Sequence, residues 1–173
     1  MAIAYNLIAS NTVGSPVASV TFSSIAGTYT DLVLAVSARS ASTGNAWDSL
    51  TLEFNGSGGA AYSTRMLYGD GGTAAGAVST GNSFVIWGHI PSNSATSNTF
   101  GNTLINIPNY TSGNYKSLIM DSVAETNAAT TIMTLTGSVW ANTAAITSIK
   151  CANYNATNFM QYSTFFLYGI LKY

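Results

Sequence analysis

Short apolar stretches separated by polar loops run through the whole chain. In one of them, Leu50, Leu52 and Phe54 alternate with Thr51 and Glu53, and a period of two is typical of a half-buried β-strand. Most stretches are rich in β-branched and aromatic residues, which favour strands. On this basis we predict strands at residues 3–9, 17–22, 32–39, 50–55, 63–68, 83–90, 99–107, 116–124, 132–140, 146–152 and 163–171.

Two of these predicted strands are apolar on both faces. In 32–39, Leu32 and Leu34 together with Val33 and Val36 supply apolar side chains to both sides, and 163–171 is the most apolar stretch of the chain. A strand of this kind belongs in the interior of a sheet or at a subunit interface. We therefore expect 32–39 to be a central strand and 163–171 to lie in the interior of a sheet or at a subunit interface.

The connections between the strands are polar and rich in Gly and Ser. The longest predicted loops are 40–49, 55–62, 69–82, 91–98 and 110–115. Helical periodicity is nearly absent, and the Ala-rich segments 72–78 and 126–131 are the helix candidates. Gly71, Gly72 and Gly76 favour a loop for the first of them. Loops at the ends of a rigid sandwich commonly carry recognition.

About ten strands in 173 residues predict a single all-β domain spanning 1–173. We expect an antiparallel β-sandwich of the jelly-roll type. An immunoglobulin-like sandwich is the second choice, because the Cys…Trp…Cys arrangement of that fold is missing. No repeat of fixed period indicates a propeller or solenoid.

Charge is scarce along the chain. Only 6% of the residues are charged, against about 25% in ordinary soluble domains, and Ser, Thr and Asn take their place. A surface with so little charge favours association with copies of the same chain, although a neutral, hydroxyl-rich monomer is the alternative. The five basic residues are scattered, which argues against nucleic-acid binding. No apolar stretch approaches membrane-helix length, so we expect no membrane partner.

Residues able to carry chemistry are too few for a catalytic site. We interpret the single cysteine, Cys151, as a buried hydrophobe, and a fold without disulfides fits assembly in a reducing cytoplasm. His89 lies between apolar neighbours and is predicted to pack in a strand. Asp121 and Glu125 are interpreted as ordinary acids, and Asp70 as a turn residue. We therefore predict no enzymatic activity, no catalytic residues, no metal site and no cofactor.

Loop aromatics are the candidate binding residues. Trp47, Tyr110 and Tyr115 lie in segments rich in Asn, Gly and Ser. Such aromatics can anchor a subunit or lattice contact, where Trp and Tyr are enriched, or form the platform of a glycan site. We favour the contact over the glycan site.

Several phrases of the chain are similar to those of a family of proteins. They are YNLIAS (5–10), VTFSSI (20–25), TYTDL (28–32), FNG (54–56), YS (62–63), LYG (67–69), IPNY (107–110), KS (116–117), NTAAITSI (142–149) and STFFLYGI (163–170). With these phrases the chain resembles, over nearly its whole length, small structural proteins of tailed bacteriophages. The resemblance implies a capsid decoration (cement) protein or a module of a tail fibre. It carries no catalytic motif.

The predicted strands fill the chain from near Met1 to near Tyr173, which leaves no room for a fibre attachment segment. The expectation is therefore a decoration protein that is assembled in the bacterial host cytoplasm and located on the capsid surface of the virion. Its partners would be copies of itself, with a trimer favoured over a dimer, and the major capsid protein. The alternative is a receptor-binding β-module of a tail fibre or spike that binds glycans.

Overall fold

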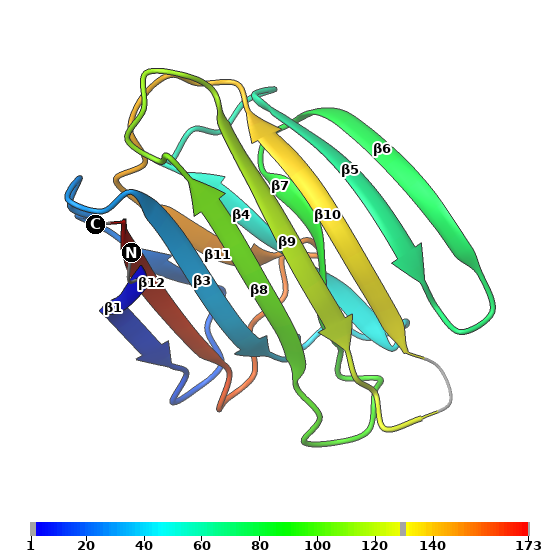
Figure 1. Ribbon diagram of the computed structural model, residues 1–173. Coiled ribbons are helices and arrows are strands. Elements are labelled where there is room, and N and C mark those ends of the chain that lie inside the picture. The colour runs from blue at the N-terminus through cyan, green and yellow to red at the C-terminus, as the bar shows by residue number, and fades with distance from the viewer. Residues whose placement is uncertain (1–2, 129–130, 173) are drawn as a thin grey trace.

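The protein is built from β-strands (Figure 1). The computed structural model describes residues 3–128 and 131–172, and in these residues it has twelve strands and no helix. The all-β class predicted from the sequence is confirmed. In chain order the strands are β1 (Ile3–Thr12), β2 (Ser19–Phe22), β3 (Asp31–Ala38), β4 (Trp47–Phe54), β5 (Tyr62–Gly69), β6 (Ala74–Asn82), β7 (Val85–Pro91), β8 (Gly101–Pro108), β9 (Lys116–Ala124), β10 (Ile132–Trp140), β11 (Ile149–Asn153) and β12 (Thr164–Lys172).

The strands form two antiparallel sheets with the core between them. The larger sheet has the order β1-β12-β3-β8-β9-β10-β5-β6 and the smaller has the order β2-β11-β4-β7. We number the strands 1 to 8 from β2 to β11, count the β8–β9–β10 meander as one strand and leave out β1 and β12. The smaller sheet then has the order 1-8-3-6 and the larger sheet has the order 2-7-4-5. This is the strand order of a jelly roll. The predicted jelly-roll sandwich is confirmed, and the meander together with β12 and β1 widens its larger sheet.

Aromatic rings fill one end of the core. On β4, Leu50, Leu52 and Phe54 are fully buried, as their alternation predicted. Trp140 from β10 stacks on Tyr62 from β5 with ring centroids 6.3 Å apart, and it meets Phe54 edge-on at 5.6 Å. The Trp140 Nε1–H donates to the Ser57 hydroxyl at 2.9 Å. Because this cluster joins the two sheets and leaves no indole N–H unpaired, it is a main source of stability.

Both strands that are apolar on two faces lie inside the larger sheet. β3 pairs with β12 on one side and β8 on the other, and β12 pairs with β1 and β3. On β12, Phe165 and Leu167 are fully buried in the core. The prediction of a central position for β3 is confirmed, and of the two positions expected for β12 the structure shows the interior of a sheet.

The segment 69–82 was predicted to be a loop, and that prediction is wrong. Its residues Ala74–Asn82 form β6, which pairs with β5 through the backbone at the edge of the larger sheet. No β6 residue is buried, so its Ala, Gly, Ser and Thr side chains show no apolar alternation. The helix candidate 72–78 lies mostly in this strand. In the candidate 126–131, the described residues 126–128 and 131 are not helical, and 129–130 lie outside the described residues.

Candidate docking face

The larger sheet turns one face to the core and the other away from it. We call the second face the outer face. Along β8, β9 and β10, buried and exposed residues alternate almost without exception. Large apolar side chains nevertheless occupy the exposed positions: Leu67 is 65% exposed, Val78 66%, Ile119 55%, Met133 58% and Leu135 51%. Exposed apolar residues gathered in this way usually mark an interaction surface.

The strand register places these side chains next to one another. Leu104 on β8 is opposite Asp121 on β9, which is opposite Leu135 on β10, and Leu135 is opposite Leu67 on β5. Residues opposite one another in adjacent strands share a face of the sheet. Exposed apolar side chains therefore lie on both sides of Asp121 from β8 to β5, and Val78 on β6, opposite Arg65, extends them to the edge strand.

The outer face also continues to the other edge of the sheet. Tyr5 and Leu7 on β1 are 60% and 55% exposed. Tyr5 meets Tyr168 of β12 edge-on, with ring centroids 6.4 Å apart. Tyr168 in turn is opposite Val33 on β3. Apolar side chains thus cover parts of the outer face from β1 to β6.

The middle of β10 has the usual pattern of a surface strand reversed. Between Ile132 and Trp140, which point inward at its ends, the inward residues Thr134, Thr136 and Ser138 are buried hydroxyls, whereas Leu135 and Val139 point outward. Apolar residues ordinarily point toward the core and polar residues toward water. A strand with this pattern fits an environment in which its outer side is also covered.

The inward hydroxyls of β10 are hydrogen-bonded. Thr134 and Thr136 both donate to the Trp87 carbonyl at 3.2 Å. Ser138 donates to the Ser63 carbonyl at 2.8 Å and shares a hydrogen bond of 2.9 Å with Thr64. These partners remove most of the cost of burying the hydroxyls. The inner side of β10 is therefore a satisfied polar layer rather than a defect.

Charge on the outer face between β8 and β6 is limited to two side chains in these fully described strands. Arg65 lies on β5 and Asp121 on β9, on either side of β10. Arg65 donates to the Thr64 carbonyl at 3.0 Å and forms no ion pair with a described residue. The two charges are therefore free to meet charges on a partner.

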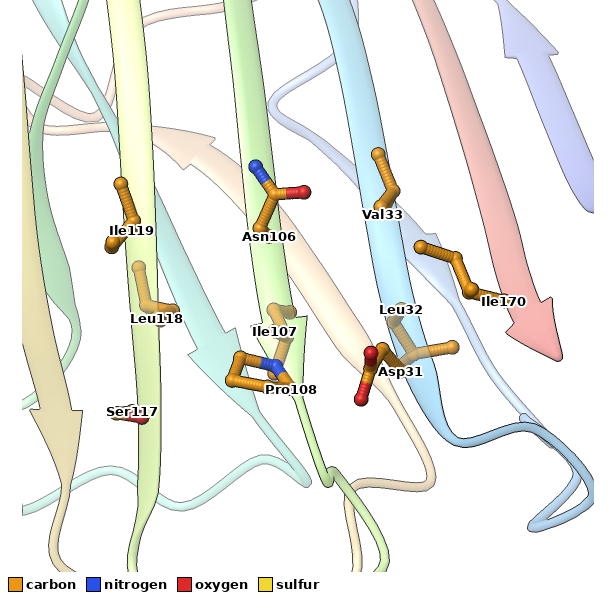
Figure 2. Close-up of a pocket in the computed structure, with 10 residues that line it drawn as sticks. All are labelled: Asp31, Leu32, Val33, Asn106, Ile107, Pro108, Ser117, Leu118, Ile119 and Ile170. Atoms are coloured by element: carbon orange, nitrogen blue, oxygen red, sulfur yellow. The ribbon is translucent and has the colours of Figure 1, made fainter. Parts of the chain in front are cut away.

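A hollow of about 340 Å³ opens in the outer face where β8 and β9 separate (Figure 2). The two strands are paired from Asn102 to Asn106 of β8, and the pairing stops before Pro108, which has no N–H to donate. Figure 2 shows Ile119, Asn106 and Val33 side by side on β9, β8 and β3, with the buried Leu118 next to Ile119 along β9. The hollow is suited to an apolar side chain of a docking partner.

The Asp31 carboxylate lies at the end of this hollow, near Pro108 in Figure 2. It is 9% exposed and accepts a hydrogen bond of 3.0 Å from the Asn109 backbone N–H. Asp31 therefore fixes the turn after β8 and sets one wall of the hollow.

Tyr110 was predicted to be a loop contact, and that prediction is wrong. The ring is fully buried in the core cluster, and its hydroxyl donates to the Ala26 carbonyl. The Tyr29 backbone N–H in turn lies 3.4 Å from the same hydroxyl. Because the apolar ring fills the core and the hydroxyl is satisfied there, Tyr110 has no surface left for a partner.

Trp47 and Tyr115 do not form one site. Trp47 is half-buried opposite Pro91, at the end of the sandwich where β7 leads to β8. Tyr115 is 62% exposed at the opposite end, where β8 leads to β9. The buried Lys116 ammonium holds that loop by donating to the Ser112 and Asn114 carbonyls at 2.7 and 2.6 Å. Their roles as separate contacts remain a prediction.

The two groups with the most reactive side chains are buried. His89 is 7% exposed, and burial lowers its pKa to about 4 against a small opposing effect of the Asp48 charge. Burial raises the pKa of Cys151 to about 12, so the thiol stays protonated. Asp70 caps a turn by accepting from the Gly72 and Thr73 N–H groups, as predicted.

Among the described residues, no group of His, Cys, Asp and Glu is arranged to hold a metal ion. The same residues contain no helix long and apolar enough to cross a membrane.

Comparison with protein-family models, with curated proteins and with solved structures gives no match. The class that the geometry defines is therefore an all-β sandwich with a broad apolar outer face.

The outer face was missed from the sequence, although a signal was present. Leu104–Ile105 and Leu118–Ile119 place apolar residues next to each other within strands. Adjacent apolar residues in a strand mean that both faces are apolar, as was recognised for 32–39 and 163–171.

Proposed function

We propose that this protein is a non-enzymatic structural module that pairs with a second copy of itself through the outer face and works as a decoration protein on a phage capsid. The observation that carries the pairing is β10, which buries hydroxyls and exposes Leu135, Val139 and Met133. The capsid setting comes from the resemblance of the sequence to phage structural proteins.

The size of the outer face supports a second copy as its occupant. Pairing centred on β10 brings the five strands β8, β9, β10, β5 and β6 of each copy over one another. Five strands spaced about 4.8 Å apart, each with about eight residues rising about 3.3 Å, cover on the order of 600 Å². Two such faces bury about 1,200 Å² in total, which is the lower end of the range for stable interfaces.

The charges on the outer face are arranged in a self-complementary way. β5 and β9 flank β10. A two-fold axis running roughly along β10, between two stacked faces, places β5 of one copy over β9 of the other. Arg65 of each copy then approaches Asp121 of its partner, and this contact occurs twice.

A dimer of this kind suits attachment to a shell. Binding to the assembled capsid and not to free subunits stabilises the shell by mass action. Repeated weak contacts with the major capsid protein add up over a symmetric lattice. With so few charges, docking is expected to depend little on salt.

The pairing is tested by the mass of the protein in solution, measured by light scattering after size-exclusion chromatography. We expect a dimer for the natural chain and a monomer for Leu135→Glu, because that change places a charge at the centre of the interface. Tyr154→Glu changes a side chain that is 57% exposed outside the larger sheet and is the matched control. A monomeric natural chain, or a Leu135→Glu dimer, contradicts the pairing.

The capsid setting is tested by locating the protein in a phage particle by cryo-electron microscopy. Density distributed over the capsid surface is expected. A bare capsid with the protein at the tail tip contradicts it and favours the receptor-binding alternative.

A further inference from the structure

Arg39 is a buried cation with no acidic partner among the described residues. It follows β3 and is only 4% exposed. Its Nη1 donates to the carbonyls of Thr96 and Thr99 at 2.7 and 3.2 Å and to the Thr99 hydroxyl at 2.9 Å, and its Nη2 donates to the Ala95 carbonyl at 2.9 Å. The ion pair found among the described residues joins Lys150 and Glu53 instead. Neutral oxygens therefore solvate a full positive charge.

The guanidinium retains donor capacity. It has five N–H groups, and Nε–H donates to none of the described residues. A guanidinium binds a carboxylate best through two parallel N–H groups. Arg39 is thus fixed in place by the 95–99 loop and still has affinity for an anion.

Arg39 contributes to a pocket of about 220 Å³ at the end of the sandwich. The pocket lies between the β7–β8 connection and the segment before β12, which is tied to Arg39 by the hydrogen bond from the Met160 N–H to the Arg39 carbonyl at 2.8 Å. The exposed side chains around it are uncharged and polar: Asn93, Ser97, Asn98 and Gln161.

An exposed tyrosine completes this pocket. Tyr162 is 66% exposed, and its backbone has a φ of 71°, a left-handed conformation that is unfavourable for a non-glycine residue. Its N–H donates to the Val13 carbonyl at 2.8 Å, which holds that backbone in place. The ring is an apolar platform beside amides and a hydroxyl.

We propose that this pocket binds an acidic saccharide, with the carboxylate of a uronic acid residue held by Arg39. The C–H face of the sugar ring packs on Tyr162, and the amides of Asn93, Asn98 and Gln161 bind its hydroxyls. A protein side chain with a carboxylate lacks the hydroxyls to match this polar rim. The pocket uses no residue of the outer face, so this inference is independent of the proposed pairing.

The test is a titration of the ¹⁵N-labelled protein with trigalacturonic acid, with neutral galactotriose as the matched ligand, followed by NMR shifts. We expect saturable shifts around the pocket with the acid and affinity at least about tenfold lower with the neutral sugar, since the ion pair is lost. Raising the salt concentration should weaken only the binding of the acid.

Two variants assign the roles. Tyr162→Ala should weaken binding at least about tenfold, whereas Tyr154→Ala, at a tyrosine 57% exposed elsewhere, should leave it unchanged. Arg39→Lys keeps the charge but loses the planar fork, and should reduce the preference for the acid over the neutral sugar. If Arg39→Lys disturbs the fold, as its spectrum would reveal, Asn98→Gly provides a milder loss of one amide at a left-handed position (φ 63°).

Absence of binding to both sugars overturns the site. Equal affinity for the two sugars overturns the role of Arg39, and unchanged binding by Tyr162→Ala overturns the role of the ring. None of these results affects the oligomer mass, so a failure here is distinguishable from a failure of the pairing.

Discussion

The two faces of the larger sheet come from the same strands but follow different rules. The inner face contains aromatic rings such as Trp140, aliphatic side chains, and hydroxyls such as that of Thr136, and these are packed between the two sheets. The outer face contains Leu135 and Ile119 with nothing in the described chain above them. The difference shows that apolar character alone does not identify a core. What separates the faces is whether the side chains are enclosed by the second sheet of the same chain.

The largest expected effect comes from opening the inner face. Trp140→Ala removes a fully buried indole between Tyr62 and Phe54, and we expect the free energy of unfolding to fall by about 4 kcal/mol. Chemical denaturation measures it. The outer-face change Leu135→Ala, measured at a concentration where the protein is monomeric, is the control and should cost less than about 1 kcal/mol. Equal losses would mean that the two faces are equally well packed.

A smaller effect is expected from protonating His89, which is buried on β7 of the smaller sheet. An exposed histidine has a pKa of about 6.5, whereas His89 in the fold has a pKa of about 4. Above pH 6.5 the stability is complete. As the pH falls from 6.5 to 4, the unfolded chain binds a proton that the folded chain does not, and about 3 kcal/mol is lost.

Denaturation curves across this pH range measure the effect. His89→Gln, which has no titrating ring, should flatten the pH dependence between 6.5 and 5, before carboxylates contribute. An unchanged slope would show that His89 is not the group responsible.

The smallest effects are expected within β10, where neighbouring residues face opposite ways. Thr136→Val keeps the shape but removes one of the two hydroxyls that donate to the Trp87 carbonyl, and should lower the free energy of unfolding by about 1 kcal/mol. Leu135→Thr should change the stability of the monomer by less than about 0.5 kcal/mol and weaken dimerisation instead. Unfolding and sedimentation measured on both variants check this reversal, and it fails if Leu135→Thr is the more destabilising change.

The sequence was sufficient for the architecture because the buried strands carry their own pattern. β3 and β12, apolar on both faces, lie inside the sheet as predicted. β6 was not predicted because it is stabilised by backbone pairing with β5. Such pairing produces no apolar alternation in a strand of small residues such as Ala75 and Gly76.

The candidate site was harder to predict, for a physical reason. Polar surroundings made Tyr110 look exposed, but its hydroxyl finds Ala26 only after folding. The outer face depends on which side chains of each strand point away from the core. In the middle of β10, the assumption that apolar residues point inward predicts the wrong direction. The pocket at Arg39 joins segments more than a hundred residues apart in the chain, which no local pattern reports.

The buried thiol of Cys151 is an internal probe of how often the smaller sheet opens. Since the side chain is fully enclosed in the smaller sheet and its pKa is raised to about 12, a thiol reagent can modify it only while that sheet is open. The rate of labelling therefore counts opening events in the native protein. If labelling slows when two copies pair through the larger sheet, then pairing also makes opening of the smaller sheet less frequent.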